Sequence, residues 1–238
     1  AEVTKMKYCV NGEWKESATD KWMTVTDSST GEAIAEIPCC TEDEVHSAIA
    51  AAHAAFPSWS QMSLTKRTQY LFKWRNVMID HLDELTLICA KELGKTLDEA
   101  KGDVLKAIEP TEFATSIPYT IQGSSALQVT TGFDCTTYRV PLGVVAGMVP
   151  MNFPAMIPWG WMVPLAIACG NTVVLKANSQ TPLTSMRMLE LFYDEAGFPK
   201  GVVNLVTCSR HEAEIFMTDE RIKAVSFVGT TGDRKSVV

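Results

Sequence analysis

The chain has 238 residues, 46% of them hydrophobic, which indicates a globular protein with room for one large domain or two small ones. Its formal net charge of −7 provides no basic footprint for nucleic acid or for an anionic membrane. The 7 cysteines form no C-x-x-C pair and the 4 histidines show no metal-ligand spacing. These patterns predict reduced thiols and no metal site.

The first part of the chain predicts a hairpin, two further strands and a helix. Asn11-Gly12 is typical of a type I′ turn between strands, and residues 24–26 and 33–37 are expected to be extended. Thr41 with Glu44 forms a capping box. The alanine-rich segment after it predicts a helix that ends near Phe56, because Pro57 disfavours continuation.

Two more helices are expected before residue 120. Residues 64–93 have helical periodicity with a break near His81, and Gly94 is placed to end the second half. Thr96 and Glu99 form another capping box, which opens a helix that frays near Pro110 or beyond. Residues 127–130 and 135–140 then look like an exposed two-stranded ribbon. Such a ribbon is marginal alone, so residues 121–141 are a candidate oligomerisation ribbon.

Regular alternation of strands and helices follows. The expected strands are 144–149, 172–176, 202–206 and 224–228, and the expected helices between them are 155–168, 183–196 and 212–217. Units of this length predict right-handed crossovers and an α/β fold with a doubly wound, Rossmann-like parallel sheet, with N-terminal helices and the protruding ribbon added to it. Continuous Val, Ile and Leu in the strands indicates burial on both faces.

Residues 140–175 contain no Asp, Glu, Lys or Arg. The five prolines in this stretch argue against a bilayer span, because each removes a backbone donor that lipid cannot replace. Burial in a protein core is therefore expected. Asn152 lies between Pro150 and Pro154 at the end of the first apolar strand, where a buried amide points to function. It is one of several polar residues at strand ends, where open parallel sheets bind ligands, although neither common phosphate-binding motif is present.

Four motifs carry a resemblance to a known family. They are residues 140–145 (VPLGVV), 150–154 (PMNFP), 170–176 (GNTVVLK) and 226–231 (SFVGTT). In order and spacing they resemble the aldehyde dehydrogenase superfamily, most closely its CoA-acylating methylmalonate-semialdehyde dehydrogenases. The resemblance implies NAD(P)-dependent oxidation of a small aldehyde with NAD or NADP as cofactor and CoA as a co-substrate of the intact enzyme. It also implies a homo-oligomer, dimer or tetramer. The reduced cysteines are typical of the cytoplasm or the mitochondrial matrix, and the acidic charge and the prolines predict no nucleic-acid or membrane partner.

The resemblance also assigns roles to residues. Asn152 matches the oxyanion-hole asparagine; the alternative is that it caps the following helix, because Asn is a favoured N-cap. Lys176 matches the lysine that holds the adenosine ribose hydroxyls. The full set of implied cofactor-binding residues is Val149, Pro150, Met151, Lys176, Ser179, Gln180, Gly229 and Thr230.

Two residues depart from the family pattern. Ser179 stands where the family usually has a glutamate, which repels the 2′-phosphate of NADP, so we expect relaxed selectivity that extends to NADP. Lys106 stands where methylmalonate-type enzymes have an arginine that grips the substrate carboxylate. It is the candidate for that role here, but a lysine lacks the bidentate fork, so the aldehyde is expected to differ.

The resemblance covers the N-terminal half of the family's length. Residues 1–120 are expected to form the first part of the dinucleotide-binding domain, 142–231 its parallel-sheet core and 232–238 a divergent tail. The catalytic domain with the nucleophilic cysteine is expected to be absent, because none of the 7 cysteines falls at its motif. This chain alone is therefore expected to be inactive. The alternative is a non-catalytic nucleotide-binding or scaffolding protein that pairs through the ribbon.

Overall fold

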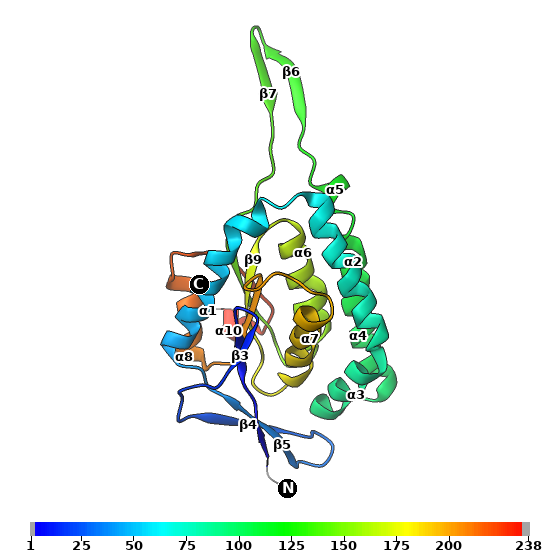
Figure 1. Ribbon diagram of the computed structural model, residues 1–238, viewed down its shortest axis with the longest axis vertical. Coiled ribbons are helices and arrows are strands. Elements are labelled where there is room, and N and C mark those ends of the chain that lie inside the picture. The colour runs from blue at the N-terminus through cyan, green and yellow to red at the C-terminus, as the bar shows by residue number, and fades with distance from the viewer. Residues whose placement is uncertain (1–2, 235–238) are drawn as a thin grey trace.

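The computed structural model describes residues 3–234 and shows a layered α/β body from which one long ribbon projects (Figure 1). The strands are β1 (Thr4–Lys5), β2 (Tyr8–Val10), β3 (Glu13–Lys15), β4 (Trp22–Thr26), β5 (Ala33–Pro38), β6 (Ser125–Thr130), β7 (Phe133–Thr136), β8 (Val144–Met148), β9 (Thr172–Lys176), β10 (Val203–Val206) and β11 (Ile222–Phe227). The helices are α1 (Glu42–Ser60), α2 (Leu64–Asp80), α3 (Leu82–Leu93), α4 (Leu97–Ala114), α5 (Ile117–Thr120), the π-helix η1 (Ile157–Met162), α6 (Val163–Ala168), α7 (Leu183–Asp194), α8 (Arg210–Ala213), α9 (Ile215–Thr218) and α10 (Thr231–Arg234).

The central sheet has the order β11-β8-β9-β10-β2-β3. Its first four strands pair in parallel, as the alternation of elements predicts, whereas the β2–β3 hairpin extends the sheet in antiparallel register. Asn11 and Gly12 have φ values of 57° and 66°, the left-handed conformation that a type I′ turn requires. A separate sheet of order β1-β5-β4 lies at the N-terminal end of the body (Figure 1).

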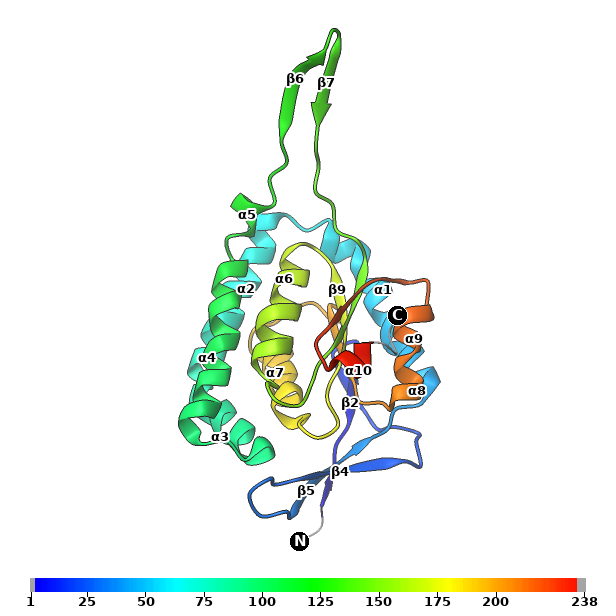
Figure 2. The same cartoon turned by 180° about the vertical axis from the view of Figure 1, so that it is seen from behind.

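Both faces of the central sheet are covered. In β9, Val174 packs with residues of α1, whereas its neighbours Val173 and Leu175 pack into the larger core that contains α6 and α7. Successive strand side chains point to opposite faces, so a strand that is buried on both sides must be apolar at every position. Figures 1 and 2 show α1, α8 and α9 on one side, and α6 and α7 on the other with α2 and α4 outside them.

The apolar stretch 140–175 forms the middle of this body. It builds β8, η1, α6 and β9, of which both strands are almost completely buried. Its second amide, Asn171, is satisfied: Oδ1 accepts from the backbone N–H groups of Leu142 and Gly143 at 2.7 and 3.1 Å, and Nδ2 donates to the Ala166 carbonyl. Across residues 3–234, no helix is long and apolar enough to cross a bilayer.

The predicted helix starts agree with the structure better than the predicted helix ends and helix types. Both capping boxes form, at Thr41 and at Thr96, and Gly94 ends α3 with a φ of 69°. The prediction that Pro57 ends the first helix is wrong, because α1 continues to Ser60 with the proline inside its last turn. The segment 155–168 is also not one α-helix, since its first part is π-helical. The Val163 N–H donates to the Pro158 carbonyl, five positions earlier, which is the spacing of a π-helix.

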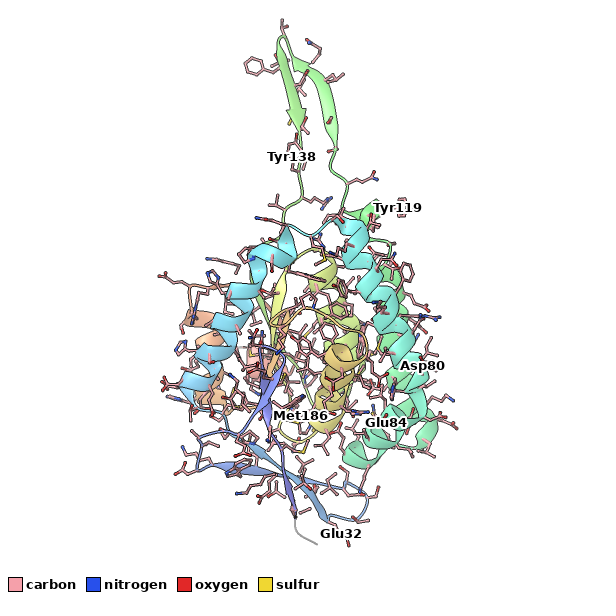
Figure 3. All side chains as sticks on the ribbon, viewed as in Figure 1. Glu32, Asp80, Glu84, Tyr119, Tyr138 and Met186 are labelled. Carbon is pink, nitrogen blue, oxygen red and sulfur yellow. The ribbon has the colours of Figure 1, made fainter. Side chains whose placement is uncertain are left out.

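The ribbon is shorter than expected on its second strand. β7 ends at Thr136, and residues 137–140 run back to the body without strand pairing. Within residues 125–136 every side chain is exposed. Figure 3 places Tyr138 on the returning segment and Tyr119 near the base of the ribbon. Part of the expected divergent tail forms α10, and residues 235–238 lie outside the described part of the chain.

Candidate functional site

A cavity of about 720 Å³ opens at the carboxyl edge of the parallel sheet. The strand order shows why it lies there. The chain passes from β8 to β9 and β10 on one side and then returns to place β11 on the other side of β8. The crevice at such a reversal is the usual ligand site of an open α/β sheet. The lining residues are Met148, Val149, Pro150, Met151, Asn152, Lys176, Asn178, Arg210, Ala213, Glu214, Met217, Phe227, Val228, Gly229 and Thr230.

Most of the residues expected to form the site meet in this cavity. Asn152 lies at its wall together with Val149, Pro150 and Met151, which follow β8. Lys176 comes from the end of β9, and Gly229 and Thr230 follow β11. The position of Gly229 admits no larger residue without rearrangement, because an added Cβ would lie 2.5 Å from the Phe227 ring. Three neighbouring strands thus bring together residues that are up to 81 positions apart, from 149 to 230.

Three expected residues lie elsewhere. Ser179 and Gln180 are in the turn after β9, next to the cavity-lining Asn178 but outside the lining itself. The Asn178 side chain accepts from the Gln180 N–H at 2.8 Å, which closes an Asx turn around Ser179. Lys106 is exposed on α4, and its amine pairs with Glu109 at 2.7 Å.

The loop that carries Asn152 is held through its backbone carbonyls. The Lys95 amine donates to the Asn152 carbonyl at 2.7 Å and lies 4.2 Å from the centre of the Phe153 ring. Hydroxyls of Thr181 and Ser185 donate to the carbonyls of Met151 and Pro154, both at 2.8 Å. Three hydrogen bonds to carbonyls between residues 151 and 154 restrict the motion of this loop.

A buried carboxylate, that of Asp103 on α4, also binds this loop and the lysine that holds it. Asp103 accepts from the Met156 N–H at 2.8 Å and pairs with Lys95 at 3.4 Å. Burial raises the pKa of Asp103, and its bonds to Lys95 and Met156 oppose that shift. The Cys89 thiol also donates to this carboxylate. The lysine that holds Asn152 is therefore itself held by α4.

The expectation of a buried amide at Asn152 is wrong, because this side chain is exposed. Its amide makes no hydrogen bond to any group that the structure describes. The helix-capping alternative does not hold. The next helix begins at Ile157, and its N-cap is Met156, without a side-chain capping bond. The amide is thus available to donate to an oxygen of a molecule in the cavity.

The cavity wall from α8 and α9 was missed by the sequence reading. Arg210, Glu214 and Met217 line the cavity, but the helix in this segment was expected to begin only at Glu212. The signal was present, because Ser209 and Glu212 form a capping box that places Arg210 at the first helical position. A helix that opens just beyond the third strand has its first turn at the ligand edge of the sheet.

The cavity lining contains no cysteine. Burial raises the pKa of Cys9, Cys40 and Cys208 to about 12, so these thiols stay protonated near neutral pH. Cys135 is exposed but lies on the ribbon, away from the cavity. The described residues therefore place the Asn152 amide at the cavity without an activated thiolate beside it.

The match to known proteins decides the family. Residues 14–237 match the model of the aldehyde dehydrogenase family. The chain belongs to the aldehyde dehydrogenase family. A malonate-semialdehyde dehydrogenase of Bacillus cereus (strain B4264) is 44% identical to this aldehyde dehydrogenase chain over 229 residues, which is 96% of the chain and 47% of that protein. The chain thus spans about half the length of the curated relatives it matches.

Solved structures of similar proteins agree in fold. A Sinorhizobium meliloti 1021 protein, assigned as a methylmalonate-semialdehyde dehydrogenase and complexed with NAD, matches with a TM-score of 0.95 at 31% identity, over 100% of this chain and 48% of its own. The methylmalonate-semialdehyde dehydrogenase of Oceanimonas doudoroffii matches with a TM-score of 0.94 at 34% identity, over 99% and 48%. An NADP-dependent enzyme of E. coli matches with a TM-score of 0.93 at 30% identity, over 98% and 48%.

Proposed function

We propose that this chain is the cofactor-binding portion of an enzyme that oxidises a small aldehyde, of the semialdehyde class, with NAD or NADP. The observation that carries the proposal is one cavity, at the reversal of strand order, that joins the free Asn152 amide to the Lys176 amine. Its volume of about 720 Å³ is in the range of small-molecule and cofactor sites. The names of the relatives, malonate- and methylmalonate-semialdehyde dehydrogenase, support the substrate class.

The residues of the cavity suit a dinucleotide. Its walls are mostly apolar, with Val149, Met151 and Phe227 to contact flat rings and Lys176 to donate to ribose hydroxyls. When bound, NAD or NADP would supply a hydride acceptor. The Asn152 amide would donate to the aldehyde oxygen and stabilise the negative charge that develops there when a nucleophile adds to the carbonyl carbon. Lys95, Thr181 and Ser185 would keep that amide in place at no reorganisation cost.

Substrate recognition is proposed to involve Lys106. Its side chain is 59% exposed, and its bond to Glu109 is a surface ion pair of a kind worth about 0–1 kcal/mol. A substrate carboxylate could therefore replace Glu109 at small cost. The acyl acceptor is proposed to be water or CoA, and the compartment the cytoplasm or the mitochondrial matrix. Because no cysteine lines the cavity, the chain by itself is expected to form no NADH or NADPH from aldehydes.

Isothermal titration of the purified chain with NAD+ and with NADP+ tests the proposal. Heat of binding at one site is expected with at least one dinucleotide, and the Lys176→Ala variant should bind it more weakly. The control is Lys73→Ala, which removes an exposed lysine of α2 far along the chain from the cavity residues. Absence of binding to both dinucleotides would favour the alternative, a scaffolding protein that pairs with a partner through the ribbon.

A further inference from the structure

Two cations line the cavity without a partner. The Lys176 amine and the Arg210 guanidinium make no hydrogen bond or ion pair with any residue of the described chain. Arg210 is unusual in this respect. Every other arginine whose side chain is described bonds to a carboxylate, a carbonyl or both, namely Arg67, Arg75, Arg139, Arg187 and Arg221. A guanidinium kept free at a cavity wall is available to an anionic ligand.

The charge around the two cations favours an anion. Glu214 is the one carboxylate among the lining residues. It lies four positions after Arg210, yet the two side chains form no ion pair in the described structure. The turn after β9 contributes Asn178, Ser179 and Gln180, none of which is acidic. An anionic group next to Lys176 and Arg210 would therefore meet no repelling carboxylate from that turn.

The strand order indicates which part of a dinucleotide would meet this anion site. Asn152 follows β8 and Gly229 follows β11, which are neighbours at one edge of the sheet. Lys176 ends β9, and Arg210 follows β10, further along the same edge. A dinucleotide with its reactive ring beside the Asn152 amide would extend toward β9 and β10. Its adenosine would then lie against Lys176 and Arg210.

We infer that Arg210, together with Lys176, binds the 2′-phosphate on the adenosine ribose of NADP, so that this cavity selects NADP over NAD. The inference rests on the proposed function and deepens it by choosing the cofactor. A guanidinium presents paired donors that match phosphate oxygens, and such charge-assisted bonds are stronger than neutral ones. The absence of acid in the turn around Ser179 removes the repulsion that would otherwise exclude this phosphate.

Two small probes isolate the 2′-phosphate, namely adenosine 5′-monophosphate and adenosine 2′,5′-bisphosphate. We expect the bisphosphate to bind the wild-type chain about 10- to 100-fold more tightly by calorimetry, the factor that one or two charge-assisted hydrogen bonds provide. Arg210→Met should abolish most of this ratio because it weakens the bisphosphate far more than the monophosphate, and Arg210→Lys should retain part of it. Ser179→Glu should reverse the preference. Lys73→Gln, which removes a positive charge outside the cavity, should leave the ratio unchanged.

The possible outcomes distinguish a failure of the 2′-phosphate inference from a failure of the proposed function. Equal affinities for the two probes, unaffected by Arg210→Met, would overturn the inference, while binding of NAD+ or NADP+ by the same protein would still support the proposed function. A loss of both probes in Arg210→Met would also overturn it, because the arginine would then hold a group common to both. Failure of the wild-type chain to bind either dinucleotide would reject the proposed function itself. Thermal unfolding of each variant checks that the fold is intact.

Discussion

At the scale of single residues, the side chain of Asn152 lines the cavity and has no hydrogen-bond partner among the described residues. The carbonyl of the same residue is bound by Lys95, so the backbone is fixed while the amide is not. An amide that merely stabilised the loop would be expected to bond within it. Asn171 shows that pattern, with both ends of its amide satisfied by backbone.

This contrast predicts the effect of removing the amide. In a protein of the relatives' full length that carries this segment, Asn152→Ala should lower the rate of aldehyde oxidation about 10²–10³-fold, because one oxyanion donor is lost. Dinucleotide affinity should change little. Steady-state kinetics and titration measure the two effects. Asn76→Ala, at an exposed asparagine of α2, is the control, and an equal loss of rate there would refute the role of Asn152.

Gly160 is required for the packing of η1 against α4. An added Cβ would lie 2.8 Å from the Lys106 carbonyl and 3.0 Å from the Ala107 Cα, both of them backbone atoms that cannot turn away. Gly160→Ala should therefore destabilise the protein by about 1–3 kcal/mol, measured by urea unfolding. Gly102→Ala on α4 is the matched control. No atom lies within 4 Å of its added Cβ, and alanine should stabilise the helix by up to about 1 kcal/mol. Equal effects at both positions would show that the close contact is absent.

At the scale of elements, α2, α3 and α7 are joined by a charged cluster around His81. Its Nδ1 lies 2.6 Å from Glu84 and its Nε2 lies 2.9 Å from Glu195, so both ring nitrogens face carboxylates and both act as donors only in the imidazolium form. Arg187 binds the same Glu84 and also Glu190. The bond to Glu84 is the main reason that the pKa of His81 is raised.

The sign of the resulting pH dependence follows from linkage. The folded protein holds this proton more tightly than the unfolded chain, so the stabilisation is complete below the ordinary histidine pKa of 6.5 and is lost as pH rises through the raised value. The wild-type protein should lose about 0.2–1 kcal/mol of unfolding free energy as pH rises through that pKa, which is the contribution of a surface ion pair. His81→Gln should not show this loss. Chemical unfolding at several pH values measures this. His53→Gln, at an exposed histidine of α1, should keep the wild-type profile, and an unchanged profile in His81→Gln would contradict the prediction.

At the scale of the whole molecule, the ribbon exposes apolar side chains that nothing else in the described chain covers. Leu127 and Phe133 are 77% and 68% exposed on a hairpin without support from the body. A hairpin with apolar side chains in water is marginal, and large exposed apolar residues usually mark an interface. We propose that a second copy of the chain covers the ribbon in the intact protein.

Replacing residues 124–137 by a short glycine linker should therefore shift the protein from an oligomer to a monomer, as measured by light scattering after size-exclusion chromatography. Affinity for the dinucleotide should persist, because no ribbon residue lines the cavity. The variant Leu127→Ser with Phe133→Ser should weaken association without shortening the ribbon. A wild-type chain that is already monomeric at all concentrations would rule out this arrangement.

Local patterns by themselves determined much of this protein. The capping boxes at Thr41 and Thr96, the Asn11-Gly12 turn and the run of apolar strands are set by neighbouring residues, and all appear in the structure. The alternation of those strands with helices predicted the doubly wound sheet, and the motifs predicted the family. Asn152 and Lys176 could be placed at one edge because parallel strands end together.

Only the tertiary structure decided the rest. Local patterns did not predict the π-helical form of η1 or the continuation of α1 past Pro57. The cavity that Arg210 lines is assembled from segments far apart in sequence. The support of Asn152 by Lys95, 57 positions away, is of the same kind. Local propensity differs by about 1 kcal/mol or less between most residues, whereas packing contributes several times more, so contacts across the fold override it.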